Sequence, residues 1–280
     1  MTGDWRSRWE GGLSLSFDRD GNRTRLREQH VTMPLAFQKV FYPVGPEICY
    51  GVILHPPGGF AKGDQLTMEI RLGAKSEVLL TTPGAGKFYE SARRAAQKVR
   101  LCLEAGAHLE WVPQETILFQ GAQMLSTLRV DLEAHATWMG WDIWRFGRSG
   151  ADEEFSRGHW RAGTEVWRDG SPLWIDRQEL LGGDALLRSR FGLQGYPVVG
   201  TFAWIGQTIS NELLGLCRSV PGPVDGSGWA VGRVAEGQGL VARYLGRSTA
   251  EARRVFAVLW AILRERLRHR PLCLPRVWNT

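Results

Sequence analysis

The strongest constraint on the fold is an alternation of apolar and polar residues that runs through most of the chain. LSLSF at 13–17, LTMEIRL at 66–72 and VRLCL at 99–103 each place apolar side chains at every second position. Successive side chains of a β-strand point to opposite faces of a sheet, so this pattern predicts strands with one buried face. EICYGVILH at 47–55 and PVVGTFAW at 197–204 are apolar almost throughout, which is typical of strands buried on both faces.

A helical pattern appears only in the last third of the chain. TISNELLGLCRSV at 208–220 repeats its apolar residues at helical spacing. The residues predicted to share the buried face are Ile209, Leu213, Leu216, Cys217 and Val220. Ser248 and Glu251 form an S-x-x-E capping box, which predicts a second helix that ends near Leu267.

These patterns divide the chain into two parts. We expect a β-rich body over about 1–205 and a β/α part over about 206–280, and therefore a mainly β protein. Within the body, Arg168-Asp169-Gly170-Ser171 lies between EVW and PLWI, which indicates a β-hairpin. Trp138, Trp141 and Trp144 have helical spacing, but Gly140 and the neighbouring residues are equally consistent with a bent strand.

Composition indicates a soluble globular protein. The chain has 280 residues, of which 43% are hydrophobic and 23% charged. MTGDWRSRWEGG at the start has no apolar stretch of the kind found in a signal peptide. The longest apolar run, FAVLWAIL at 256–263, is too short to span a bilayer. We therefore expect a cytoplasmic protein that does not bind a membrane.

The formal charge of +6 is concentrated near the C-terminus. From Arg243 to Thr280 there are nine arginines against Glu251 and Glu265, a local +7, so the remainder carries about −1. A basic segment of this kind can meet nucleic acid, a membrane or an acidic protein. Aromatic residues are not interleaved with the arginines in the way that stacks bases, so we expect a protein partner and no nucleic acid.

TTPGAGKFY at 81–89 has some features of a phosphate-binding loop. A P-loop requires a glycine five residues before its Gly-Lys pair and a Ser or Thr directly after the lysine. Thr81 and Phe88 occupy these positions here, and Pro83 removes a backbone N–H donor. The residues after Lys87 could form a helical turn, but we interpret the segment as a turn that ends a strand.

No enzymatic constellation is evident. The chain contains no G-x-S-x-G elbow and no H-E-x-x-H pair. Its cysteines, at 49, 102, 217 and 273, are widely separated, which argues against a disulfide framework or a zinc knuckle. Cys102 lies on or near the apolar side of its strand and is expected to be an inert small side chain. One alternative is a β-rich ligand- or carbohydrate-binding module whose tryptophans line a platform.

Several Gly/Pro-rich and aromatic motifs together closely resemble the urease accessory protein family UreD, called UreH in some bacteria. The motifs, in chain order, are FYPVG at 41–45, HPPGGFAKGD at 55–64, TTPGAGKFY at 81–89, LEWVPQETILFQGA at 109–122, GWDIWRFGR at 140–148, DGSPL at 169–173, RYLG at 243–246 and the ending LPRVWNT. The resemblance extends over nearly the whole chain. It implies a single UreD-like domain over 1–280, with a helical stack of β-sheets and two helices.

The resemblance also implies a function. Members of this family are not enzymes; they are scaffolds that act with UreF and the GTPase UreG, dock on apo-urease and deliver nickel to its active site. Nucleotide binding then belongs to UreG, and no cofactor is tightly bound, only Ni²⁺ in transit. TTPGAGKFY becomes framework or tunnel wall. Gly86 stands where relatives commonly have Ser or Thr, and Asp176 where Glu is common.

Within the matched motifs, three carboxylates are predicted to line the nickel path: Asp64, Asp142 and Asp176. Ni²⁺ binds imidazole and thiolate tightly, whereas carboxylates hold it more weakly. A conduit requires the weaker kind of ligand, because binding must assist passage without trapping the ion. His55 and Cys49 are candidates for a stronger site where nickel enters. The alternative for Asp64 is that it caps a turn, and for Asp142 and Asp176 that backbone or arginine partners satisfy them.

Overall fold

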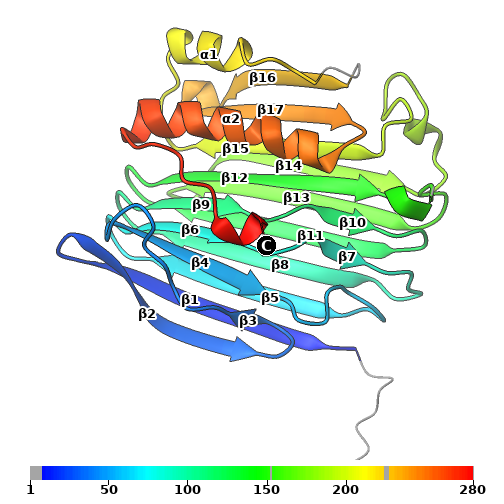
Figure 1. The fold of residues 1–280 in the computed structure, drawn as a ribbon, viewed down its shortest axis with the longest axis horizontal. Helices are drawn as coiled ribbons and strands as arrows, with labels where there is room; N and C mark the ends of the chain where they lie inside the picture. The colour runs from blue at the N-terminus through cyan, green and yellow to red at the C-terminus, as the bar shows by residue number, and fades with distance from the viewer. Residues whose placement is uncertain (1–7, 152, 224–226, 280) are drawn as a thin grey trace, which may run out of the picture.

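A computed structural model describes residues 8–151, 153–223 and 227–279. Two β-sheets are stacked, and two helices cover the outer face of the larger one (Figure 1). The seven-stranded sheet has the order β14 (Ser171–Leu181), β13 (His159–Arg168), β11 (Gln123–Leu132), β8 (Ala95–Leu103), β5 (Gln65–Leu72), β1 (Glu10–Asp20) and β2 (Arg23–Thr32). The ten-stranded sheet has the order β16 (Gly228–Val234), β17 (Gly239–Gly246), β15 (Val198–Ile205), β12 (Thr137–Phe146), β9 (His108–Val112), β6 (Glu77–Thr81), β4 (Ile48–Leu54) and β3 (Ala36–Phe37). In addition, β10 (Thr116–Leu118) pairs with β12, and β7 (Gly86–Phe88) pairs with β10.

The chain builds these sheets as a coil. It passes from β4 to β5 in the other sheet and returns to β6, and the same alternation continues through β13. Neighbouring coils pair in parallel: Glu77 lies beside His108, and His108 beside Thr137. One coil therefore takes about 30 residues, as in a solenoid. The expected mainly β fold, a helical stack of sheets with two helices in the last third, is confirmed.

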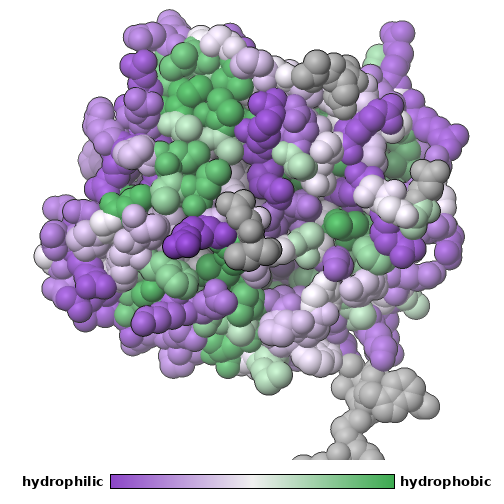
Figure 2. All heavy atoms as spheres, viewed as in Figure 1, coloured by the Kyte–Doolittle hydropathy of each residue, from purple (hydrophilic) through white to green (hydrophobic). Residues whose placement is uncertain are grey.

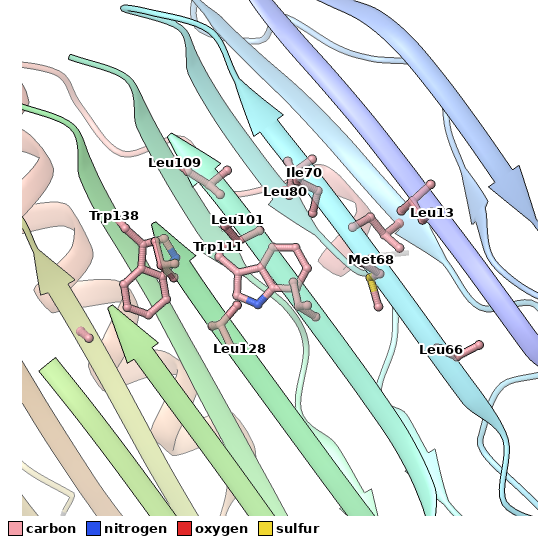
Figure 3. Packing of buried hydrophobic residues seen from close by; sticks show 14 of the residues in the cluster. Leu13, Leu66, Met68, Ile70, Leu80, Leu101, Leu109, Trp111, Leu128 and Trp138 are labelled. Carbon is pink, nitrogen blue, oxygen red and sulfur yellow. The ribbon is translucent and has the colours of Figure 1, made fainter. Parts of the chain in front are cut away.

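The alternating segments form the expected strands and bury one face between the sheets. LSLSF lies in β1, LTMEIRL in β5 and VRLCL in β8, and their apolar residues meet those of the ten-stranded sheet (Figure 3). Leu101 and Leu109 are fully buried there. Removing such side chains from water supplies the main stabilisation of the stack, at roughly 25 cal/mol per Å² of apolar surface.

A second core lies between the ten-stranded sheet and the helices α1 (Asn211–Arg218) and α2 (Thr249–Arg268). Ser248 caps α2 by accepting a hydrogen bond from the Glu251 N–H at 3.2 Å, as the capping box predicted. The predicted buried face of α1 is correct except at one position. Leu216 is 37% exposed, while Leu214 is buried in its place, because α1 rests on the sheet along a slightly rotated face.

The predicted hairpin is confirmed, and the structure decides between the two alternatives left open for the tryptophans at 138, 141 and 144. Asp169 and Gly170 both have positive φ and join β13 to β14 in a two-residue hairpin. Trp138, Trp141 and Trp144 lie in a strand, β12, rather than in a helix. Trp138 and Trp144 therefore enter the inter-sheet core and Trp141 the core beneath the helices.

TTPGAGKFY includes a turn that ends a strand, as interpreted: β6 ends at Thr81, β7 follows at Gly86–Phe88, and the residues after Lys87 form no helical turn. The prediction for Cys102 is wrong, because Cys102 does not lie on the apolar side of β8. The strand alternation turns it to the outer face, beside Arg100, while Leu101 points into the core.

Most arginines of the basic C-terminal segment, residues 243–280, pair with carboxylates elsewhere in the chain. The pairs are Arg243–Asp176, Arg253–Glu115, Arg264–Glu110, Arg268–Glu77 and Arg270–Glu77, with Arg254 pairing to Glu251 within α2. The segregation of charge along the sequence is thus largely neutralised by the fold. No helix in the described part of the chain is long and apolar enough to cross a membrane.

Candidate functional site

A cavity of about 210 Å³ lies among β4, the loops that follow β6 and β9, and β12. Its wall is mostly apolar, with polar groups at a few points. The polar side chains that line it are His55, Thr82, Gln97, Gln114, Thr116 and Asp142. Four of the matched motifs contribute to this lining, so the segments that carried the resemblance converge here.

TTPGAGKFY supplies one side of the cavity, as the loop between β6 and β7. The next coil holds this loop in place: the Gln114 N–H donates to Thr82 Oγ1 at 2.9 Å, and the Gly86 N–H donates to the Glu115 carbonyl at 2.9 Å. A Cβ on Gly86 would lie 3.2 Å from Thr116 Oγ1. The Thr116 hydroxyl therefore occupies the region to which a Ser or Thr at position 86 would contribute.

Asp142 is the carboxylate in the cavity wall. It lies in β12 and is mostly buried, and its carboxylate has no hydrogen-bond or ion-pair partner among the residues that the structure describes. Burial, and to a smaller extent the negative charge of Asp176, raises the pKa of the Asp142 carboxyl to about 7. Near neutral pH this group therefore exchanges between a neutral and an anionic form.

Asp176 lies close to Asp142 but is fully paired. It reaches across from β14 in the opposite sheet, and Arg243 Nη2 donates to its Oδ1 at 2.7 Å and Arg243 Nη1 to its Oδ2 at 2.9 Å. Gln178 Nε2 also donates to Oδ2. Thr201, the partner of Asp142 in the β12–β15 register, accepts from Arg243 Nη1 at 2.6 Å. The structure thus brings two of the predicted carboxylates together, but only one is left without a counter-ion.

Asp64 lies at a different place and holds a turn. Its Oδ2 accepts from the Ala61 N–H at 2.8 Å, and its Oδ1 from the Trp9 N–H at 2.9 Å. Asp64 does not line the cavity. Its negative charge nevertheless acts on His55, which does line the cavity. Burial lowers the pKa of His55, opposed by the Asp64 charge, so a neutral imidazole faces the cavity near neutral pH.

Cys49 is buried in the inter-sheet core and does not line the cavity. Burial raises the pKa of its thiol to about 11, so the metal-binding thiolate form is suppressed near neutral pH. Among the described residues, no three His, Cys, Asp or Glu side chains lie close enough to hold one metal ion. The arrangement instead offers isolated oxygen ligands, which hold a cation weakly.

Sequence reasoning missed the amide and hydroxyl groups of this wall. Gln114 and Thr116 follow Trp111 by a few residues, and nothing in their local sequence marks them as functional. The signal that could have found them is the coil repeat, which places Gly86, Thr116 and Trp144 in one row of the parallel strands β7, β10 and β12.

Comparison with known proteins identifies the family to which the chain belongs. The profile of the family described as UreD urease accessory protein matches residues 10–279. The chain is 44% identical over 273 residues to the urease accessory protein UreD of Nostoc sp., covering 97% of this chain and 96% of the relative. The identity is 42% over 272 residues to UreD of Thermosynechococcus vestitus (96% and 98% covered) and 43% over 278 residues to UreD of Dechloromonas aromatica (97% and 95%). The chain belongs to the UreD family.

UreD membership confirms the resemblance drawn from the motifs. The family consists of urease accessory proteins rather than of catalysts, which places the chain in urease maturation. The alternative of a tryptophan platform finds no support in the fold of this UreD chain. Among the described tryptophans, the following are buried in the two cores: Trp111, Trp138, Trp141, Trp144, Trp160, Trp204 and Trp260.

Proposed function

We propose that this UreD chain is a non-catalytic scaffold that acts with UreF and UreG, docks on apo-urease and conveys nickel to its active site. Family membership supports the role in urease maturation. The observation that carries the nickel proposal is Asp142, a carboxylate without a counter-ion in the wall of a cavity built from the family motifs. We place this activity in the cytoplasm.

The chemistry of the cavity suits passage rather than storage. A carboxyl whose pKa is about 7 can bind a divalent cation as it loses its proton and release the cation as it regains one. The Gln97 amide and the Thr116 hydroxyl add neutral oxygens, and the neutral His55 imidazole also lines the cavity. Asp176, held by Arg243, contributes negative potential near Asp142. Asp64 acts only through His55.

The test is a co-expression experiment. The chain is produced with UreF, UreG and the urease subunits in cells that lack their own UreD, and urease activity, nickel content of urease and co-purification are measured. The proposal predicts that the wild-type chain restores nickel content and activity. Asp142→Asn should retain the complex with UreF and UreG but lower both quantities several-fold.

Two results would contradict the proposal. If the wild-type chain neither co-purifies with UreF nor restores urease activity, the scaffold function is wrong. If Asp142→Asn restores full nickel content, the scaffold stands and the conduit through Asp142 is wrong. For the isolated chain we also expect no GTP binding by calorimetry, since TTPGAGKFY joins two strands rather than a strand to a helix.

A further inference from the structure

Gln114 and Glu115, in the loop that forms one side of the cavity, are held by α2. The Arg253 Nη1 group donates to Gln114 Oε1 and, at 2.8 Å, to Glu115 Oε2. Thr249 Oγ1, in the first turn of α2, lies 3.2 Å from Glu115 Oε1. The Glu115 carboxylate also lies near the N-terminal end of α2, where the helix dipole favours a negative charge. α2 thus contacts the cavity wall through side chains that are more than a hundred residues apart in sequence.

The backbone of the same two residues holds the other side of the wall. The Gln114 N–H donates to Thr82 Oγ1, and the Glu115 carbonyl accepts from the Gly86 N–H. Whatever fixes Gln114 and Glu115 therefore also fixes TTPGAGKFY. Gln114 is 8% exposed and its Oε1 faces Arg253, so Arg253 also determines how the Gln114 amide is oriented relative to the cavity.

Within the part of the chain that the structure describes, no comparable contact to a loop of the body holds the outward side of α2. Val258 and Ile262 of α2 are only partly buried, and Leu216 of α1 is exposed. Figure 2 shows apolar side chains gathered over α1 and the neighbouring part of α2. The position of α2 is thus set by its inner contacts, of which those of Arg253 and Thr249 reach the loop at Gln114 and Glu115, and of these two only Arg253 holds Gln114 itself.

We propose that Arg253 is a positioning residue through which α2, by holding Gln114 and its neighbour Glu115, sets the shape of the cavity wall at Gln114. The functional consequence, control of cation passage, rests on the proposed nickel function. The effect of Arg253 on the positions of Gln114 and Glu115 does not depend on that function. Loss of the Arg253 contact frees the Gln114 amide and loosens both loops, while the cores that hold the fold together stay intact.

The test compares Arg253→Met with Arg254→Met. Arg254 is the next residue on the same helix, is exposed, and pairs with Glu251 within α2. Amide hydrogen exchange is measured by mass spectrometry in the purified chain. Arg253→Met should speed exchange at residues 82–86 and 113–116 by about tenfold, the effect of losing a charge-assisted hydrogen bond. Arg254→Met should leave these loops unchanged.

A second variant, Glu115→Gln, removes the other partner of the contact and keeps the test valid if Arg253→Met does not fold. The double variant should speed exchange by less than the two single effects combined, because the Arg253–Glu115 contact is broken in all three variants, while the contacts Arg253–Gln114 and Thr249–Glu115 are each affected by only one substitution. In the co-expression assay, Arg253→Met should raise several-fold the nickel concentration needed for half-maximal urease activation, with UreF still bound.

Unchanged exchange in the loops, or additive effects in the double variant, would overturn the proposal. So would loss of activation without faster loop exchange, since Arg253 would then act by contacting a partner. If exchange responds as expected but Asp142→Asn activates urease fully, the positioning role stands and the nickel proposal fails.

Discussion

Two buried carboxylates on opposite faces of the ten-stranded sheet have opposite surroundings. Glu110, in β9, lies in the core beneath the helices, where Trp260 Nε1 donates to its Oε1 at 2.8 Å and Arg264 Nε lies 3.5 Å away. Burial alone would raise the pKa of Glu110, but His108, Arg264 and Trp260 together hold it below its ordinary value. Asp142, in β12, faces the cavity without a counter-ion, and its pKa is raised to about 7.

The contrast separates a structural carboxylate from a functional one. Taking a charge out of water is costly unless it is paired and hydrogen-bonded. Around Glu110 the fold supplies the pairing, and the Arg264 guanidinium is further tied to the Tyr50 hydroxyl. Around Asp142 it does not, although Arg243 lies nearby and is used for Asp176. A carboxylate left uncompensated in this way is costly for stability, which points to a role in binding.

The largest expected effect on stability comes from breaking the contact between Glu110 and Arg264. Arg264→Met leaves Glu110 as an uncompensated buried charge and should cost about 3–5 kcal/mol of unfolding free energy. The control, Arg266→Met, changes an exposed arginine on the same helix and should stay within about 0.5 kcal/mol. Urea denaturation measures both. Equal stability of the two variants would show that Glu110 is not held by Arg264.

At Asp142, the carboxylate without a counter-ion, removing the charge should stabilise the fold, whereas the change at Arg264 destabilises it. Asp142→Asn removes a group that resists ionisation in the fold, so at pH 8 it should raise the unfolding free energy by roughly 1–3 kcal/mol while lowering urease activation. A destabilised Asp142→Asn variant at pH 8 would mean that the Asp142 carboxylate has a partner.

Asp176→Asn weakens the contact with Arg243 and should lower the unfolding free energy by roughly 1 kcal/mol.

The pH dependence of the unfolding free energy tests the raised pKa of Asp142 separately. The folded protein keeps a proton on Asp142 that the unfolded chain releases above about pH 4, because the folded pKa is about 7. Stability contributed by this group therefore falls as pH rises from about 4 to 7. The stability difference between Asp142→Asn and wild type should be near zero at pH 4 and grow to its full value by pH 8. Parallel profiles would contradict the raised pKa.

The smallest effect is expected at Cys49. It is fully buried, its thiol stays protonated, and it does not line the cavity. Cys49→Ala should cost about 1 kcal/mol through a small packing defect and leave urease activation unchanged. Activation assays across a nickel titration check this. A higher nickel requirement would return Cys49 to the conduit as a ligand.

Much of the fold could be predicted from the sequence, because strands and helices follow from local periodicity. The alternation in β1, β5 and β8 and the capping box of α2 are local signals. The coil was expected only from the family resemblance and not from local periodicity, because its repeat shows only as aligned positions occupied by different residues, such as Glu77, His108 and Thr137.

The site was predicted less completely. Asp142 and His55 were found through their motifs and do line the cavity, while Asp64 holds a turn and Asp176 is paired. Gln114 and Arg253 were missed because their contact joins distant segments, and a lone arginine in a basic helix carries no local signal. The charge segregation was visible in sequence, but only the fold shows that carboxylates of the body neutralise it.

The central claim is that the Asp142 carboxylate is unpaired, titrates near neutral pH and meets a divalent cation. The most direct test is a carbon-13 NMR titration of the aspartate carboxyl groups, with Asp142→Asn used to assign the resonance. In the metal-free protein the Asp142 carboxyl should titrate with a midpoint near 7. A divalent cation should move this midpoint downward, because metal and proton compete for the same oxygens. An ordinary midpoint near 4, or a midpoint that a divalent cation leaves unchanged, would contradict the claim.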